Sequence, residues 1–325
     1  MCGFQGLSYN DFINFGILNL MKLLIFLLLL SIYPSFVQAK KLYKYQDAKG
    51  RWYFSDKAPK TDKPVEVRQL KASAKRYIWL ENKGSKKQPE YFVINNHKAP
   101  VEIEFELTKS TNVMAQPSLP RRFIVQPGHS ETLFKIRGIN PEQSWQYSLQ
   151  YRYIIGSPLA THDTGAIYIP PFEKSTSRAI SQAFGGQFSH TDEQNKYAVD
   201  LVMPVNTPIH AARAGTVVEV NNDFFKGGTK QSYKSRANSI RILHNDGSMA
   251  VYAHLALETA QVYPGLKVYA GQLIGYSGNT GFSSGPHLHF AVQINKGMQL
   301  VSIPFKFTTA DNTVKVPKAG TLLSN

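Results

Sequence analysis

The sequence predicts a mainly β protein in which a further, antiparallel β-rich domain follows a β-sandwich-like domain and a small β-hairpin module. Three observations lead to this fold class. Aromatic and polar residues alternate near the N-terminus, residues 101–107 alternate apolar and acidic side chains with period two, and the C-terminal third places glycine turns between short apolar strands. No helical stretch longer than residues 176–183 interrupts this pattern. The 325 residues suffice for two or three separate cores.

The first 39 residues have the composition of an export signal. Met21-Lys22 precedes an unbroken apolar run, and the small residues of Val37-Gln38-Ala39 suit signal peptidase. We expect residues 1–39 to be a signal peptide region with Met21 as the true start; an unusually long targeting segment is the alternative. The apolar run is short for a membrane span, so no stable span is expected.

Cysteine usage and charge limit the chemistry and the partners. The one cysteine, Cys2, lies in the signal region, so a metal site in the mature chain would use His, Asp and Glu. Residues 40–89 hold 15 Lys and Arg against 5 Asp and Glu, which is +10 of the formal net charge of +15. An exported basic protein meets acidic envelope polymers rather than nucleic acid. We therefore expect an envelope polymer as partner and no nucleic acid.

The N-terminal half divides into three predicted segments. Residues 40–70 form a small basic β module, with strands on either side of a turn at 47–50. Its Lys-x-Tyr-Lys opening and Tyr-Phe-Ser-Asp close resemble a short module of exported bacterial proteins. Residues 71–89, rich in Lys, Pro and Ser, are a predicted linker and strand entry. Residues 90–172 are a predicted immunoglobulin-like β-sandwich, with strands at 101–107, 122–125, 132–136 and 145–155.

Residues 173–310 hold six of the nine histidines. His287 and His289 are two residues apart in an apolar run, so in a strand both imidazoles point to one face and can meet one metal ion. The turn-dense residues 275–286 let the backbone approach a substrate before the strand begins. Taken alone, His-x-His is a weak signal, because histidines on a strand face are more often ordinary surface or core residues.

A longer motif surrounds this pair. Residues 278–290, Gly-Asn-Thr-Gly-Phe-Ser-Ser-Gly-Pro-His-Leu-His-Phe, closely resemble the signature of the lysostaphin-like, or LytM-type, zinc metallopeptidases. The resemblance extends back through 207–217, 243–247 and 251–255, and it covers roughly residues 184–294. It implies a β-sheet groove peptidase domain, placed at 173–310 before a polar tail at 311–325. In this family zinc is held by His, Asp and His, plus a water, with two further histidines beside it.

Residue by residue, the resemblance implies a role for each member of the set. His289 matches the zinc-binding second histidine of His-x-His, and His287 matches the catalytic first. His254, in Tyr-Ala-His-Leu, matches the other catalytic histidine. Asp200 matches the aspartate ligand. The implied cofactor is Zn2+.

The first zinc ligand departs from the commonest family pattern, His-x-Gly-x-Asp, because residue 196 is a lysine. We expect His190, ten residues before Asp200, to take this role, with the polar insertion Thr191–Lys196 looping out. His210 is the rival ligand, although it occupies an apolar position of the family pattern, where packing or lining the groove is expected. Ordinary hydrogen-bonding roles are expected for His97, His129, His162 and His244.

The function implied by the resemblance is a zinc metalloendopeptidase that hydrolyses peptide cross-links of bacterial peptidoglycan in the periplasm or cell envelope. Two alternatives stay open: a non-catalytic adaptor of the same fold that activates other wall hydrolases, and a secreted bacteriolytic enzyme. The scissile bond is also open, since both D-alanyl to diaminopimelate bonds and glycine-rich bridges are cut by proteins with these motifs. The loop at 221–237 is expected to wall the groove or to be a flexible insertion, and the N-terminal domains are the candidate surface for an envelope protein partner.

Overall fold

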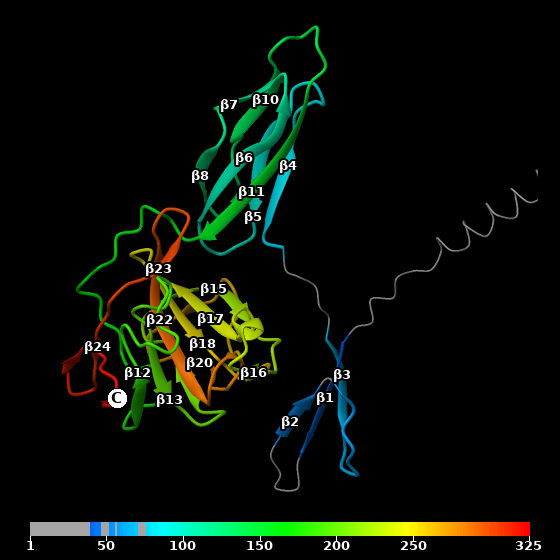
Figure 1. The fold of residues 1–325 in the computed structure, drawn as a ribbon. Coiled ribbons are helices and arrows are strands. Elements are labelled where there is room, and N and C mark those ends of the chain that lie inside the picture. Colours follow the sequence, from blue (N-terminus) through cyan, green and yellow to red (C-terminus); the bar gives the residue numbers. More distant parts are fainter. Residues whose placement is uncertain (1–39, 47–51, 56, 71–75) are drawn as a thin grey trace, which may run out of the picture. The chain divides into compact units, whose positions relative to one another are not determined.

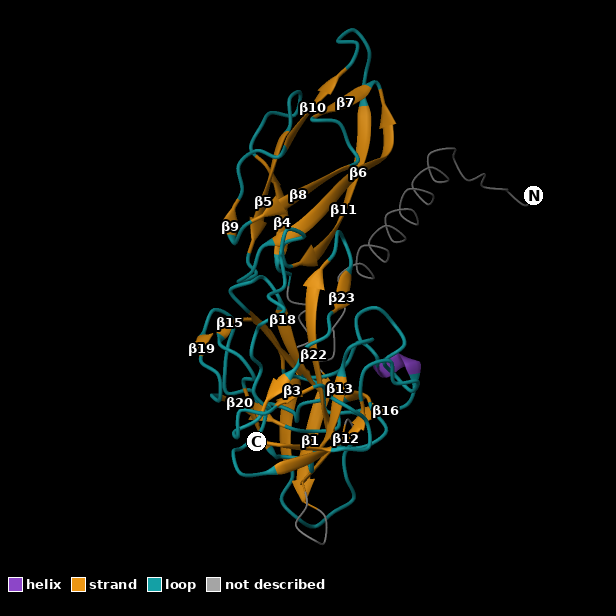
Figure 2. Cartoon of the chain, turned by 90° about the vertical axis from the view of Figure 1, so that its left-hand side faces the viewer, coloured by secondary structure: helices purple, strands orange, loops and turns teal. Residues whose placement is uncertain are grey.

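The fold is known from a computed structural model that describes residues 40–46, 52–55, 57–70 and 76–325 (Figure 1). The signal region 1–39, with Cys2 and Met21, and the turn at 47–50 lie outside the described residues. Within the described part of the chain, the single helical element is the short 3-10 turn η1 (Gln231–Tyr233), and all other elements are strands (Figure 2). The mainly β fold class is confirmed. No helix of this part has the length and apolar content that crossing a membrane requires.

The chain forms two compact units, residues 1–72 and residues 73–325. In the first unit, β1 (Lys40–Gln46) lies between β2 (Trp52–Ser55) and β3 (Glu66–Leu70), and both pairings are antiparallel. Leu42 of β1 is buried. The sheet therefore has a third strand beyond the two that the alternation of aromatic and polar residues predicts.

The second unit begins with two antiparallel sheets that share one core. The strands are β4 (Ile78–Asn82), β5 (Glu90–Asn95), β6 (Val101–Thr111), β7 (Val113–Gln116), β8 (Arg121–Val125), β9 (Gly128–His129), β10 (Phe134–Gly138) and β11 (Gln146–Ile155). One sheet has the order β4-β5-β10-β7, with β9 on β5, and the other has the order β11-β6-β8. Alternate residues of β6, including Ile103 and Phe105, are fully buried between them. This arrangement is a β-sandwich.

The first strand of the sandwich lies inside the segment predicted as a linker. Residues 78–82 pair along their whole length with β5, and Ile78 belongs to the sandwich core with 1% of its surface exposed. The prediction of a linker over 71–89 is wrong for this stretch. A single apolar cluster among many lysines and serines hides a strand whose partner lies only eight residues further on.

The rest of the unit is built on one large antiparallel sheet of order β19-β15-β17-β18-β22-β13-β12-β26, with β23 on β22. Its strands are β12 (Ser177–Gln182), β13 (Val199–Val202), β15 (Gly215–Asn221), β17 (Ser239–Leu243), β18 (Met249–Ala253), β19 (Lys267–Val268), β22 (His287–Asn295), β23 (Leu300–Ser302) and β26 (Leu322–Ser324). Short strand pairs flank it: β14 (Pro208–His210) with β20 (Leu273–Tyr276), β16 (Gly227–Gly228) with β21 (Gly281–Phe282), and β24 (Phe307–Thr308) with β25 (Val314–Lys315).

The central strand β22 separates core from groove by its period of two. Leu288, Phe290 and Val292 are fully buried in the main hydrophobic core of this sheet. The residues that alternate with them, among them His287 and His289, therefore face the other side of the sheet. The alternation that places three apolar side chains in the core also places both histidines on one open face.

Two stretches of this domain differ from their predicted state. Residues 176–183, the one stretch with helical character, contain strand β12, which pairs with β13 and β26. Only Ile180 in this strand is fully apolar and buried, so its period of two is hidden among small polar residues. Residues 311–325, predicted as a polar tail, end in β26, where Leu323 is 1% exposed in the core. Residues 311–325 thus supply the edge strand of the large sheet and belong to the domain.

The sandwich is joined to the end of β22 opposite the histidines. The buried carboxylate of Glu102 accepts hydrogen bonds from Asn295 Nδ2 at 3.0 Å and from the Met298 amide at 2.6 Å. Ile155 and Met249 belong to a small apolar cluster that spans both parts. The start of β6 and the end of β11 in the sandwich thus share buried polar and apolar contacts with the sheet of the C-terminal domain.

A buried ion pair stabilises the loop after β17. Arg213 Nη1 lies 2.9 Å from Asp246 Oδ2, and the side chains are 14% and 9% exposed. The other oxygen, Asp246 Oδ1, accepts hydrogen bonds from the amide and hydroxyl of Ser248. Burial would raise the pKa of Asp246, but the hydrogen bonds from Arg213 and Ser248 hold it well below its usual range.

Asp246→Asn is expected to lower the free energy of unfolding by about 2 to 3 kcal/mol at pH 7, because Arg213 loses its charged partner. A carboxyl group with a depressed pKa stabilises the fold above its unfolded pKa of about 3.9 and loses that contribution as pH falls towards the folded value. The difference between variant and parent should therefore be full above about pH 5 and shrink below about pH 4. Urea unfolding at several pH values measures it, with the exposed Asp223→Asn as control; a pH-independent difference would exclude this mechanism.

Candidate functional site

The site is formed where β22 lies between β13 and β18. Asp200 of β13 pairs directly with His289, and Ala253, the last residue of β18, pairs with His289 from the other side. His254 follows Ala253. Residues up to 89 positions apart in the sequence are thus brought together by strand register.

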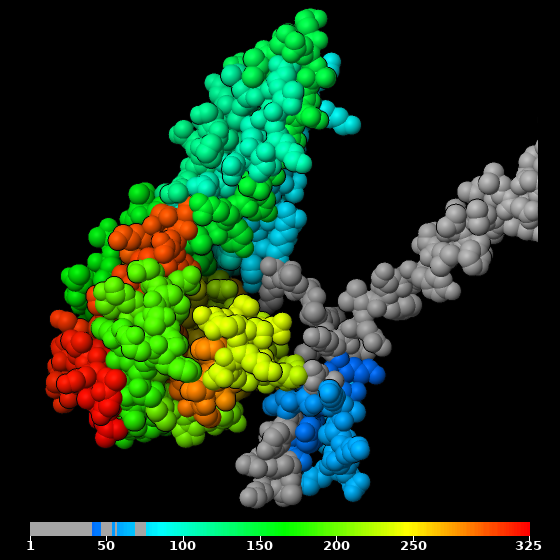
Figure 3. Space-filling model, viewed as in Figure 1, coloured from blue at the N-terminus to red at the C-terminus, as the bar shows by residue number. Residues whose placement is uncertain are grey.

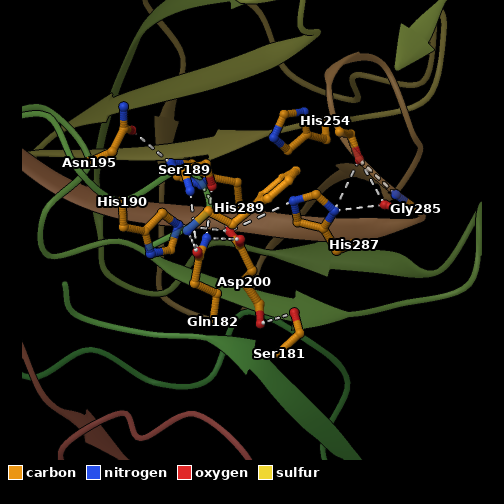
Figure 4. A network of polar contacts seen from close by, with 12 residues as sticks. Ser181, Gln182, Ser189, His190, Asn195, Asp200, His254, Gly285, His287 and His289 are labelled. Carbon is orange, nitrogen blue, oxygen red and sulfur yellow. Dashed lines mark hydrogen bonds and ion pairs between the residues drawn. The ribbon is translucent and has the colours of Figure 1, made fainter. Parts of the chain in front are cut away.

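Three of the five predicted site residues have the spacing of metal ligands (Figure 4). His190, Asp200 and His289 each offer a ligand atom, and these atoms lie within 4.8 Å of one another. His190 Nε2 is 3.2 Å from Asp200 Oδ1, and His289 Nδ1 is 2.9 Å from the same oxygen. Ligands at about 2.0 to 2.1 Å from a tetrahedral zinc are separated by roughly 3.3 Å, which is close to these values.

The hydrogen-bonding capacity of the two rings also fits a cation at this point. His190 Nδ1 lies 2.9 Å from the Ala183 carbonyl, while its Nε2 faces the Asp200 carboxylate. His289 Nε2 lies 3.1 Å from Asn195 Oδ1, while its Nδ1 faces the same carboxylate. Every ring nitrogen therefore faces an acceptor, although a neutral imidazole has only one N–H. A metal ion between the two rings and Asp200 lets each ring donate its one proton outwards.

The carboxylate is held ionised by its surroundings. Burial would raise the pKa of Asp200, but the hydrogen bonds from His190 and His289 keep it far below its usual range. Burial would likewise lower the pKa of His190, and the hydrogen bond and charge of Asp200 raise it instead. A buried anion with two imidazoles aimed at it attracts positive charge.

Residues that sequence reasoning missed support these three side chains. Asn195 Nδ2 donates to Asp192 Oδ1 at 2.8 Å, which turns Asn195 Oδ1 towards His289. Gln182 Nε2 donates to Asp200 Oδ2 at 2.9 Å. The insertion Thr191–Lys196 loops out as expected, and it also contributes contacts to the ligands. No motif pointed to Asn195 or Gln182, because amides in polar segments are too common to single out.

The two predicted catalytic histidines lie beside the metal cluster and face each other. Their ring centroids are 4.6 Å apart. His254 Nδ1 lies 2.6 Å from the Thr280 carbonyl, and His287 Nδ1 lies 2.7 Å from the Gly285 carbonyl. Because a carbonyl only accepts, each Nδ1 carries the proton and each Nε2 keeps a free lone pair. His287 Nε2 is 3.7 Å from Asp200 Oδ1.

Burial keeps both rings neutral. It lowers the pKa of His254 to about 3, together with the neighbouring histidines, and it lowers the pKa of His287. Two neutral imidazoles with free Nε2 atoms can accept a proton from water at neutral pH.

The backbone at His254 helps to aim its ring. This residue has a φ of +65°, in the left-handed region, directly after β18. The following residue, Leu255, turns back into the core and is fully buried. The sharp turn at the end of the strand leaves the imidazole on the groove side.

A groove of about 500 Å³ runs from His254 and His289 along the face of the sheet. One rim comes from the loop before β13, which includes Phe188 and Asn195, and the other from residues 221–237. The latter loop contributes Asn221, Gln231, Lys234, Ser235 and Ala237 to the lining. Figure 3 shows this part of the chain, in yellow-green to yellow, on the surface. Of the two expectations for the loop, the structure therefore supports a groove wall.

A smaller pocket of about 190 Å³ lies on the other side of the site and is lined by Asp200 and His287. Phe188 and Phe282 line both cavities. Their rings are stacked, with centroids 5.8 Å apart. This aromatic pair separates the two halves of the cleft above the metal cluster.

The remaining histidines of this domain lie apart from the cluster. His210, the rival ligand, is absent from the metal-ligand group and from the lining of both cavities. His244 Nδ1 donates to the Ala214 carbonyl at 2.8 Å, and burial lowers its pKa to about 4. His244 thus has a hydrogen-bonding position, and neither histidine belongs to the cluster.

The sequence profile of peptidase family M23 matches residues 194–300. Residues 194–300 are an M23 peptidase domain. The lysostaphin-like resemblance of the motifs is thereby confirmed. Asp200, His254, His287 and His289 lie within the M23 domain, whereas His190 lies four residues before the matched segment.

Relatives of the M23 domain include proteins that are named as endopeptidases. Glycyl-glycine endopeptidase ALE-1 of Staphylococcus capitis is 40% identical over 102 residues, which is 31% of this chain and 25% of that protein. Peptidoglycan DD-endopeptidase ShyA of Vibrio cholerae is 38% identical over 91 residues, 28% of this chain and 18% of that protein. The chain thus spans a quarter or less of these two relatives. Among solved structures, the catalytic domain of lysostaphin from Staphylococcus simulans is 27% identical, with a TM-score of 0.28, over 44% of this chain and 88% of that one.

Proposed function

We propose that this protein is a zinc-dependent endopeptidase that hydrolyses peptide cross-links of bacterial peptidoglycan. The observation that carries the proposal is the arrangement of His190, Asp200 and His289 around one point, with His254 and His287 beside it in an open groove. The relatives named as glycyl-glycine endopeptidase and peptidoglycan endopeptidase support the substrate class. A groove that is open along a sheet face suits a polymer better than a small molecule.

Zinc is the proposed ion because two imidazoles and one carboxylate are donors that this metal prefers, and three protein ligands leave a position for water or substrate. When bound, it polarises a carbonyl group and makes water a nucleophile near neutral pH. The proposed ligands are His190, Asp200 and His289.

The protein's own residues supply proton transfer and orientation. His254 and His287 are neutral, and each presents a free Nε2 to the site. One of them can take a proton from the attacking water, and the protonated ring can return it to the leaving amine or stabilise the oxyanion by a hydrogen bond. The Thr280 and Gly285 carbonyls fix the ring orientations, so neither imidazole has to reorganise during the reaction.

Export to the periplasm or cell envelope is part of this proposal, because the substrate lies there. The basic residues of 40–89 would raise the local concentration of the protein at acidic wall polymers. The two β modules before the M23 domain are the proposed surface for the wall or for an envelope protein.

Metal analysis combined with sacculus digestion tests the proposal. Purified protein should contain about one zinc per chain and release cross-linked peptides from sacculi. A chelator should abolish release, and added zinc should restore it. Zinc-free protein that releases nothing, yet stimulates another wall hydrolase, would favour the non-catalytic adaptor. Fractionation of producing cells separates a periplasmic enzyme from a secreted bacteriolytic one.

A further inference from the structure

The side chain of Arg241 lines the larger groove at the end remote from His289. The floor of this groove consists of alternate residues of three neighbouring strands: Ser239 and Arg241 of β17, Val251 and Ala253 of β18, and His289 and Gln293 of β22. Arg241 pairs with Val251, which in turn pairs with Ala291. Two strand spacings of about 4.8 Å and two residue steps of about 3.3 Å place the Arg241 backbone roughly 12 Å from that of His289. An extended peptide covers this span in three or four residues.

Two hydrogen bonds to residues of other strands of the sheet hold the guanidinium of Arg241 in place. Its Nε donates to Glu219 Oε2 at 3.2 Å, and its Nη1 donates to Gln293 Oε1 at 2.8 Å. Gln293 is itself oriented, because its Nε2 donates to the Gln194 carbonyl at 2.8 Å. Arg241 Nη2 has no hydrogen-bond partner among the residues that the structure describes. The side chain is 14% exposed, so one edge of the fork faces the groove.

The carboxylate partner of Arg241 does not itself line the groove. Glu219 is absent from the lining residues, whereas Arg241 and Lys234 belong to them. Asp192 is the one acidic lining residue, and its Oδ1 already accepts two hydrogen bonds from Asn195. The groove therefore offers a peptide the Arg241 cation and an oriented amide at the end remote from the histidines, whereas Lys234 lies nearer to them, with its Nζ 5.8 Å from the centroid of the Phe282 ring.

We propose that Arg241, oriented by Glu219 and Gln293, binds a free carboxylate of the substrate three or four residues from the scissile bond. This inference rests on the proposed peptidase function and narrows its substrate to peptides that carry such a carboxylate. Planar guanidinium groups recognise carboxylates through paired N–H donors, and fixing the fork beforehand reduces the entropy lost on binding. Arg241 is thus assigned a role in specificity, remote from the bond that is cut.

The test compares peptides that differ in one charge. Three synthetic dimers share a D-alanyl to diaminopimelate cross-link: one has free carboxylates, one has its isoglutamate carboxylates amidated, and one has its free diaminopimelate carboxylates amidated. The wild-type protein should lose about 10- to 100-fold in kcat/KM on the dimer with amidated isoglutamate carboxylates, one of which lies three residues from the bond on the D-alanine side. A loss confined to the dimer with amidated diaminopimelate carboxylates would contradict the inference, because those groups lie within two residues of the bond. Arg241→Gln should show the same loss on the free dimer, mainly through KM, and should no longer discriminate the amidated one. Equal kcat/KM of the wild type for all three dimers, or discrimination retained by Arg241→Gln, would overturn the inference.

Binding of the same dimers separates this inference from the proposed function. If no dimer is cut, the proposed cleavage of this bond fails, and Kd values from fluorescence anisotropy still decide the role of Arg241. Wild-type protein should bind the free dimer about 10-fold or more tightly than the dimer with amidated isoglutamate carboxylates, whereas Arg241→Gln should bind both alike. Equal Kd values for the wild type contradict the inference.

Two further variants guard against a merely structural effect. Arg241→Gln leaves the partly buried Glu219 without its charged partner, so the double variant Glu219→Gln, Arg241→Gln removes both charges together. It should fail to discriminate the dimers, like the single variant; restored discrimination would overturn the inference. Lys267→Gln removes the same charge outside the groove and should discriminate like the wild type. A thermal unfolding scan of each variant shows that the fold is retained.

Discussion

His287→Ala should retain its metal and lose about 10²- to 10⁴-fold in turnover, the usual contribution of general acid–base catalysis. The ring faces His254 across the site, and its Nδ1 is fixed by the Gly285 carbonyl. It is not among the residues with metal-ligand spacing. Zinc content by mass spectrometry and initial rates of peptide release from sacculi give the two readouts.

His210→Ala is the matched control for this experiment, because it removes a histidine of the same domain that lies outside the groove lining. It should keep both zinc and turnover. Loss of zinc in His287→Ala would mean that the roles of the two strand histidines are reversed.

His190→Ala should lose both zinc and activity, with turnover down by about 10³-fold or more, because an ion held by three protein ligands is left with two. His190 is fully buried, and its Nε2 is aimed at Asp200. A metal titration that compares the apparent Kd of wild type and variant measures the first effect, and sacculus digestion measures the second.

This variant tests the least regular assignment of the site. Full activity and normal zinc content in His190→Ala would show that another residue, His210 or an acidic residue of the insertion, is the first ligand. The fold would be unaffected by that result, but the proposed ligand set would change. The His287→Ala result is independent of it.

Strand β22, which carries His287 and His289, could be predicted in detail, because the alternation of its side chains determines both the core and the site. In β22 the alternation that buries Leu288, Phe290 and Val292 also sets His287 and His289 on the opposite face. His190 could be proposed only through the missing histidine at position 196, since nothing in its local sequence marks a ligand.

Other parts of the site could not be predicted, because they depend on strand order. Arg241 enters the groove because β17 is two strands away from β22 in the sheet. Asn195 reaches His289 across 94 residues of sequence. Edge strands such as β4 and β26 could not be predicted for a similar reason: each is a short apolar run within a long polar stretch and gains its burial from a partner that the local pattern does not reveal.

The backbone conformation at position 254 restricts which residue types fit there, independently of catalysis. At a φ of +65°, an ordinary L-residue costs about 1 to 2 kcal/mol, and a β-branched one costs more, while glycine is free and asparagine and aspartate are tolerated. Related chains that lose the histidine at this turn should therefore drift to asparagine, aspartate or glycine, and rarely to valine or isoleucine. In those chains the backbone conformation of the turn would be retained although the catalytic histidine has been lost.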